Sequence, residues 1–159
     1  GLADDPDLHI SDSALSELGF IESGTNENCL MRALKTADWV RRATIYSAFC
    51  DYSSEASHAV LRKAAIDEPQ PTARRWAIMA LLDREPQAQH EQILLGFLEK
   101  EKHPLPLAAI LGTLIQLGRE EFIERFDKLA DYPTRSRTLR HQIGWAMELH
   151  LNFEEDEDV

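Results

Sequence analysis

The sequence predicts an all-α fold, namely a right-handed α-solenoid of about four repeats, each a pair of antiparallel helices. Three observations predict this fold. A segment of about 13 residues returns at intervals of about 33, and a fixed period of this size is typical of repeat arrays. The helices that contain this segment are apolar on almost every side, which favours burial between neighbours. Between the helical stretches stand residues that end one helix and start the next.

The repeated segment is clearest in its first two copies. Thr36–Ala48 aligns with Pro69–Leu81, and weaker copies follow at Leu105–Leu117 and Arg137–Leu149. The last copy deviates most, as expected of a terminal repeat that faces water.

Small residues keep the register of the four copies. Two positions three residues apart hold them, so both lie on one helix face. The pairs are Thr44 with Ser47, Ala77 with Ala80, Ala109 with Gly112, and His141 with Gly144, where only the glycine is small. Because small side chains allow another helix to come close, we expect Gly112 and Gly144 to lie at close helix contacts.

Each repeat begins with an amphipathic helix and continues with a more apolar one. The expected first helices are Asn26–Lys35, Ser54–Ile66, Gln87–Glu101 and Arg119–Ala130. The expected second helices are Asp38–Asp51, Thr72–Arg84, Leu105–Leu117 and Thr134–Leu151. Asp38 is suited to start a helix, and Gly118 is suited to end one.

In the first two repeats, the start of the second helix resembles a known family. Asp38, Val40, Arg41 and Ala43, followed by small residues, resemble the HEAT repeat, particularly the short bacterial HEAT-like kind. The third copy lacks the arginine, and the fourth is recognised mainly by its position. The resemblance implies that the second helices line the concave side of a curved stack, and that this surface holds a partner.

The domain organisation follows from the repeats. We expect an N-terminal leader with a short capping helix at residues 1–25 and a HEAT-like repeat domain at residues 26–151. A disordered acidic tail is expected at residues 152–159. The approximate repeats are 26–51, 54–84, 87–118 and 119–151.

Charge and composition limit the classes of function. The 159 residues carry a net charge of −11. Five of the acids lie in Glu154–Asp158, and three more, Asp4, Asp5 and Asp7, lie near the N-terminus. Without these eight acids the rest of the chain has a net charge of −3. The acidic ends are expected to aid solubility, and the alternative is that the C-terminal residues are themselves a ligand. No apolar run is long enough to span a membrane, and we expect a soluble, cytoplasmic protein.

Catalytic and metal-binding motifs are missing from the sequence. It has no glycine-rich phosphate loop, no Gly-x-Ser-x-Gly, no His-Glu-x-x-His and no Cys-x-x-Cys. We therefore expect no enzyme activity, no metal and no cofactor. Cys29 and Cys50 lie at the open end of the first helix pair, where they are either buried thiols or a disulfide.

The repeated arginine pair supplies the candidate site. A helical projection places Arg42 and Ile45 on one side of their helix and Arg75 and Ile78 on the matching side of the next. Stacked, these residues would form a partner-binding groove with a cationic rim and an apolar floor. Trp39, at a helix start, is the expected exposed anchor.

A second set of residues is expected to be structural. The HEAT-like resemblance implies that Arg41 and Arg74 pair with acids of the turns, a ladder to which Asp38 belongs and which Asp67 or Glu68 can extend. For Arg42 and Arg75, the sequence allows either this structural role or contact with a partner.

The predicted function is a non-enzymatic scaffold or adaptor that binds a protein or peptide on its concave second-helix surface. The alternatives are a HEAT-like protein of the alkylated-base glycosylase type and a bilin lyase-like protein. The net charge of −11 argues against nucleic acid, because backbone recognition needs clustered cations. The sequence near the cysteines gives no distinctive support to a bilin function.

Overall fold

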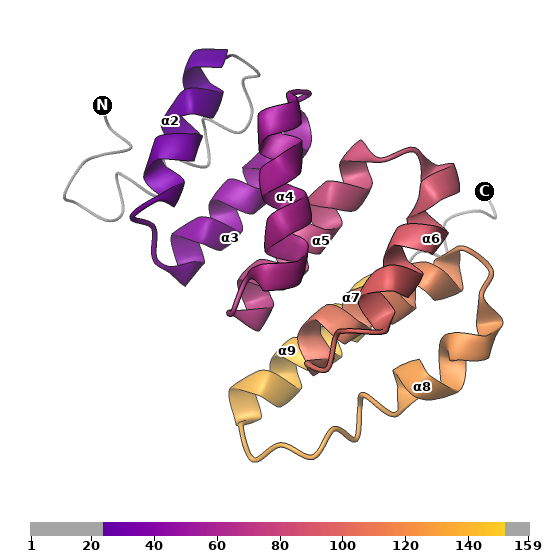
Figure 1. Cartoon of the computed structure of the whole chain (residues 1–159). Coiled ribbons are helices and arrows are strands. Elements are labelled where there is room, and N and C mark those ends of the chain that lie inside the picture. Colours follow the sequence, from indigo (N-terminus) through magenta and orange to yellow (C-terminus); the bar gives the residue numbers. More distant parts are fainter. Residues whose placement is uncertain (1–23, 152–159) are drawn as a thin grey trace, which may run out of the picture. The chain divides into compact units, whose positions relative to one another are not determined.

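The computed structural model describes residues 24–151, and every regular element among them is helical, which confirms the all-α class. The described residues divide into two compact units, residues 24–87 and residues 88–151 (Figure 1). The expected leader helix and acidic tail lie outside the described residues, except that Gly24 and Thr25 begin α2. The solenoid arrangement and the number of repeats stay predictions.

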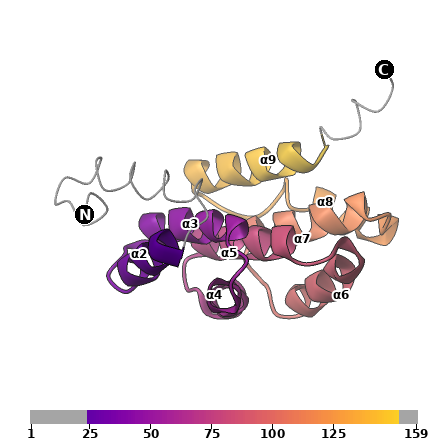
Figure 2. The ribbon, with the colours of Figure 1, turned by 90° about the horizontal axis from the view of Figure 1, so that it is seen from above.

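The first unit holds two helix pairs. Its elements are α2 (Gly24–Leu34), α3 (Trp39–Ala48), the 3₁₀ turn η2 (Phe49–Asp51), α4 (Glu55–Asp67) and α5 (Pro71–Arg84). Helices α3 and α5 pack side by side, and α4 packs against α5 and covers one face of the pair (Figure 2).

Local sequence explains where these helices begin. The Asp38 carboxylate accepts a hydrogen bond of 2.9 Å from the backbone N–H of Arg41 and so caps α3. The Ser54 hydroxyl accepts one of 3.2 Å from Ser57 at the start of α4. Pro71 opens α5, where its missing N–H costs nothing.

The core of the first unit consists of side chains with almost no exposed surface. They include Ile45, Phe49, Leu61 and Ile78. Phe49 meets Tyr52 edge to face, with ring centroids 6.2 Å apart. Each such side chain contributes about 1.5–3 kcal/mol relative to exposure.

The second unit is built around one apolar helix. Its elements are α6 (Gln87–Leu98), α7 (Pro104–Gln116), η3 (Glu120–Phe122), α8 (Ile123–Asp127) and α9 (Arg137–Leu151). Helix α7 is buried over most of its length and packs chiefly against α9, with further contacts to η3 and α8. Figures 1 and 2 show α7 in the layer between α6 and α9.

Gly118 ends α7, as expected. Its φ of +82° is a conformation that other residues rarely adopt. The backbone N–H of Gly118 donates to Ile115 and that of Arg119 donates to Leu114, at 2.8 and 3.0 Å. This pattern is a Schellman motif, which satisfies the last carbonyl groups of the helix.

Several expected helices differ in extent from those observed. The stretch predicted as Arg119–Ala130 is divided into η3 and α8. Helix α9 begins three residues later than predicted, because the Ser136 hydroxyl accepts a hydrogen bond from the backbone N–H of Leu139.

The expectation of a close helix contact at Gly144 is wrong. A Cβ atom added to Gly144 would meet no atom within 4 Å. This residue therefore faces open space, whereas Gly112 is buried.

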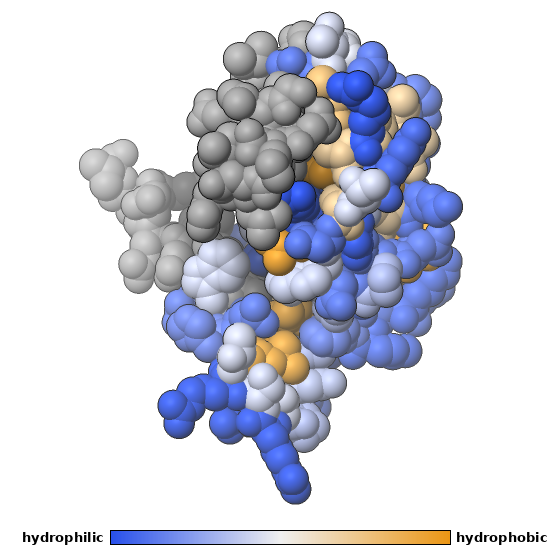
Figure 3. Space-filling view, turned by 90° about the vertical axis from the view of Figure 1, so that its left-hand side faces the viewer, coloured by the Kyte–Doolittle hydropathy of each residue, from blue (hydrophilic) through white to orange (hydrophobic). Residues whose placement is uncertain are grey.

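The surface agrees with the composition of the helices. The side of the molecule drawn in Figure 3 is largely hydrophilic, with smaller hydrophobic areas among the polar ones. None of the described helices is both long and apolar enough to cross a membrane.

Candidate functional site

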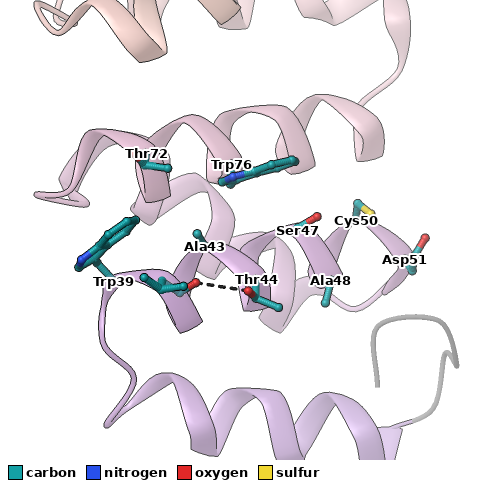
Figure 4. Close-up of a pocket in the computed structure, with 10 residues that line it drawn as sticks. Trp39, Ala43, Thr44, Ser47, Ala48, Cys50, Asp51, Thr72 and Trp76 are labelled. Carbon is teal, nitrogen blue, oxygen red and sulfur yellow. Dashed lines mark hydrogen bonds between the residues drawn. The ribbon is translucent and has the colours of Figure 1, made fainter. Parts of the chain in front are cut away.

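A groove of about 540 Å³ runs between α3 and α5 in the first unit (Figure 4). Both helices were predicted as second helices of neighbouring repeats. The lining residues are Trp39, Val40, Ala43, Thr44, Ser47, Ala48, Cys50, Asp51, Thr72 and Trp76.

Large and small side chains divide the groove into walls and floor. Trp39 begins α3 and Trp76 lies on α5, so the two indoles come from different helices (Figure 4). Trp39 is 41% exposed and Val40 is 46% exposed. Ala43 and Ser47 have small side chains that leave space in the groove, so the groove offers apolar surface to a partner.

Only one of the predicted partner-binding residues lines this groove, and it is Trp39. Ile45 and Ile78, which we expected on the groove floor, have 0% and 1% of their surface exposed. Arg75 is also buried, with 7% exposed. The structure therefore does not bring the five predicted residues together on one surface.

Arg42 pairs with Glu68 instead of facing outward. Its Nε and Nη2 donate to the two carboxylate oxygens of Glu68, each at 2.8 Å, and Nη1 donates to the Ala37 carbonyl at 3.0 Å. The Tyr46 hydroxyl donates to Oε2 of Glu68 at 3.0 Å. This bidentate pair joins α3 to the turn between α4 and α5, a structural role.

Electrostatics at Glu68 follow from these contacts. Burial alone would raise its pKa, but hydrogen bonds from Arg42, the Gln70 backbone and Tyr46 outweigh burial and lower the pKa below its usual range. Burial raises the pKa of Tyr46 to about 12, with a further contribution from the carboxylate. Glu68 is therefore ionised and Tyr46 is protonated at neutral pH.

The predicted ladder takes a different form. Asp38 caps α3 through the Arg41 backbone, and Arg74 donates from Nη1 to the Glu68 carbonyl at 2.5 Å. Arg74 thus meets the turn as expected, although at a backbone oxygen. The arginine that reaches the turn carboxylate is Arg42, one position after the residue that we predicted.

The sequence holds a signal for Glu68 that we missed. Its carboxylate accepts from the Gln70 N–H at 3.0 Å, just before Pro71. In the second unit, Glu101 accepts from the His103 N–H at 2.7 Å, just before Pro104. The pattern Glu-x-x-Pro recurs after 33 residues, and both glutamates are buried.

Arg75 lies against the neighbouring indole. Its guanidinium carbon is 5.5 Å from the ring centroid of Trp76, a cation–π distance. Burial lowers the pKa of Arg75, although an arginine stays charged at neutral pH.

A smaller polar cavity adjoins the groove. Its volume is about 360 Å³, and it shares Cys50 and Asp51 with the groove. His58 also lines it, with Nε2 2.6 Å from Oε1 of Glu85. Arg84, another lining residue, donates from Nη1 to the Ser57 hydroxyl at 2.9 Å.

Neither cysteine is in a disulfide. Cys29 and Cys50 are both free thiols. Burial, followed by the charges of Asp51 and Asp83, raises the pKa of Cys50 to about 11. A thiol with this pKa stays protonated at neutral pH and is a poor nucleophile.

Within residues 24–151, no group of three or more histidine, cysteine, aspartate or glutamate side chains is placed to hold a metal ion. Comparisons with family models, with curated proteins and with solved structures found no match to this chain. The candidate site therefore rests on the geometry of the groove.

Proposed function

We propose that this protein is a non-enzymatic interaction module that binds an amphipathic helical segment of a protein partner in the groove between α3 and α5. The observation that carries the proposal is the exposed apolar rim formed by Trp39 and Val40, beside a groove wide enough to take side chains. Exposed tryptophans are frequent anchors of protein interfaces.

The shape of the groove supports a helix as the occupant. Small residues at Ala43 and Ser47 lie one helical turn apart on α3, while Trp76 forms the opposite wall. An apolar stripe at positions i, i+4 and i+7 of a partner helix would place its side chains along such a groove. This surface belongs to predicted second helices, where the HEAT-like resemblance puts the partner.

The test uses amphipathic helical peptides selected by phage display on the full chain. The three tryptophans give three indole N–H signals in a ¹H–¹⁵N spectrum. A selected peptide should shift the signals of Trp39 and Trp76 and leave that of Trp145 unchanged. Peptides that shift only Trp145 would contradict the proposal.

A matched pair of variants makes the test specific to the groove. Ser47→Phe should fill the groove and weaken peptide binding at least tenfold. Ala59→Phe adds a similar ring on the exposed side of α4 and should leave the affinity unchanged. Equal affinity for both variants would place the binding site elsewhere.

The two rival functions have direct readouts in the same preparation. A bilin bound to the purified protein would give visible absorbance. An alkylated-base glycosylase would release the modified base from duplex DNA. Either result would replace the interaction module as the proposed function.

A further inference from the structure

The second unit carries a cationic surface that the proposed groove does not use. Between Asp131 and Glu148 the sequence has no acidic residue, but it contains three arginines and His141. The arginines are Arg135, Arg137 and Arg140. This stretch therefore has a local charge of +3 in a chain whose net charge is −11.

The cationic side chains of this stretch are solvent-exposed. Arg135, Arg137, Arg140 and His141 are all exposed, and Trp145 is 46% exposed. None of the ion pairs found among residues 24–151 involves these three arginines. Other arginines of the fold, such as Arg42 and Arg119, are held by glutamates.

Helical geometry gathers Arg137, Arg140, His141 and Trp145 on one side of α9, and Arg135 lies just before its first turn. Arg137, His141 and Trp145 are spaced by four residues and so lie above one another. Ile143 and Met147 are buried on another face, and α9 packs against α7. The open space at Gly144 leaves room for a side chain beside Trp145.

The size of the surface favours a short peptide over a nucleic acid. Arg137 and Trp145 are about 12 Å apart along the helix axis, at 1.5 Å per residue. Asp131 precedes the cationic stretch and Glu148 follows it. A nucleic acid backbone requires cations over a longer track than this one.

The chemistry of the side chains identifies the kind of partner. Guanidinium groups form forked pairs with carboxylates, and an indole provides an apolar anchor beside them. We propose that Arg135, Arg137, Arg140 and Trp145 form a docking surface for an acidic peptide segment of a protein partner, with carboxylates one helical turn apart and an apolar side chain that packs on Trp145.

The probe for this surface is a fluorescein-labelled decapeptide of eight glutamates and aspartates around one leucine and one phenylalanine. Fluorescence anisotropy should show binding to the full chain that weakens as the salt concentration rises. Combined Arg137→Ala and Arg140→Ala should weaken binding at least tenfold. Trp145→Ala should also weaken binding. The size of this effect should depend little on the salt concentration, because the lost contact is apolar.

The matched control removes the same charge from a neighbouring helix. This control combines Arg125→Ala on α8 with Lys128→Ala directly after the helix. Both residues are exposed, and the affinity should stay within twofold of the original. Circular dichroism should show the same helical content for both double variants. If both double variants weakened binding equally, the effect would come from net charge alone, and the proposal would be overturned.

Two further measurements exclude other occupants. If the decapeptide binds only after residues 152–159 are removed, the surface belongs to the chain's own acidic tail and the partner proposal fails. If single-stranded DNA of equal charge binds more tightly at the same salt and is lost in the same arginine variant, the partner is a nucleic acid. Neither result would bear on the groove between α3 and α5, which Ser47→Phe tests separately.

Discussion

Glu68 is a residue on which several polar contacts of the first unit converge. Its carboxylate receives Arg42, Tyr46 and the backbone of Gln70, and its carbonyl receives Arg74. Because the carboxylate is buried, removal of its charge leaves the Arg42 guanidinium without its counter-charge and with one acceptor oxygen fewer. The turn before α5 is therefore expected to be sensitive to one substitution.

We predict that Glu68→Gln destabilises the protein by about 1–3 kcal/mol at neutral pH, through the lost charge-assisted hydrogen bonds to Arg42. A carboxyl group with a lowered folded pKa stabilises the fold above its unfolded pKa, here 4.5, and loses that contribution as the pH falls toward the folded pKa. The difference between original and variant should therefore shrink below about pH 4.5, as urea unfolding at a series of pH values would measure.

The control for Glu68 is a carboxylate on the surface. Glu124 of α8 pairs with Lys128, which follows the helix, and both side chains are largely exposed. Glu124→Gln should leave the unfolding curve unchanged at every pH. A loss for Glu68→Gln that does not depend on pH would show that the ionised carboxylate is not the source of stability.

The Cys50 thiol is predicted to react slowly. With its pKa raised to about 11, only about a thousandth of it is thiolate at pH 8, against about a quarter for an ordinary thiol. Iodoacetamide should alkylate it on the order of a hundredfold more slowly in the folded Cys29→Ser variant than in the same variant in urea. Similar rates would mean that the thiol is not buried.

Among the elements, α9 and the end of α7 show opposite uses of glycine. Gly144 lies inside α9 with open space around it, whereas Gly118 has a positive φ. Alanine favours a helix interior but is strained at positive φ.

We predict that Gly144→Ala stabilises the protein by about 0.5–1 kcal/mol. Gly118→Ala should destabilise it by about 1–2 kcal/mol. Thermal unfolding followed by circular dichroism would measure both changes. Destabilisation by Gly144→Ala would indicate that the surface of α9 at this position is occupied.

Sequence reasoning found the helices because their ends carry local signals. Asp38, Pro71 and Gly118 act within a few residues, so their effect does not depend on the rest of the fold. Which arginine side chain faces the turn, in contrast, depends on packing. Arg41 and Arg42 differ by about 100° around α3, and no local signal states which of them faces the turn. The buried carboxylate at Glu68 decides it.

The groove was only partly foreseen for a related reason. The small residues predicted a close approach between helices, and Ala77 and Ala80 are indeed buried. Their counterparts on α3, Thr44 and Ser47, instead line the groove. Small side chains permit a helix to approach, but the packing of the two helices decides whether space remains.

Across the whole molecule, charge is distributed very unevenly. Residues 24–151 contain all 17 lysines and arginines together with 17 acids, so this part has no net charge. The remaining 11 acids lie in residues 1–23 and 152–159. An uncharged body cannot steer a partner over long range, so recognition by the groove has to come from shape and apolar contact.

The position of Cys50, shared by the groove and the polar cavity, gives chemists a point of attachment. Because the thiol reacts slowly, an electrophile that meets it only briefly will rarely modify it. A fragment that rests in the groove long enough would be captured, so the yield of covalent adduct would rank fragments by residence time. The same property that makes Cys50 unsuited to catalysis would make it a selective handle for mapping what the groove accepts.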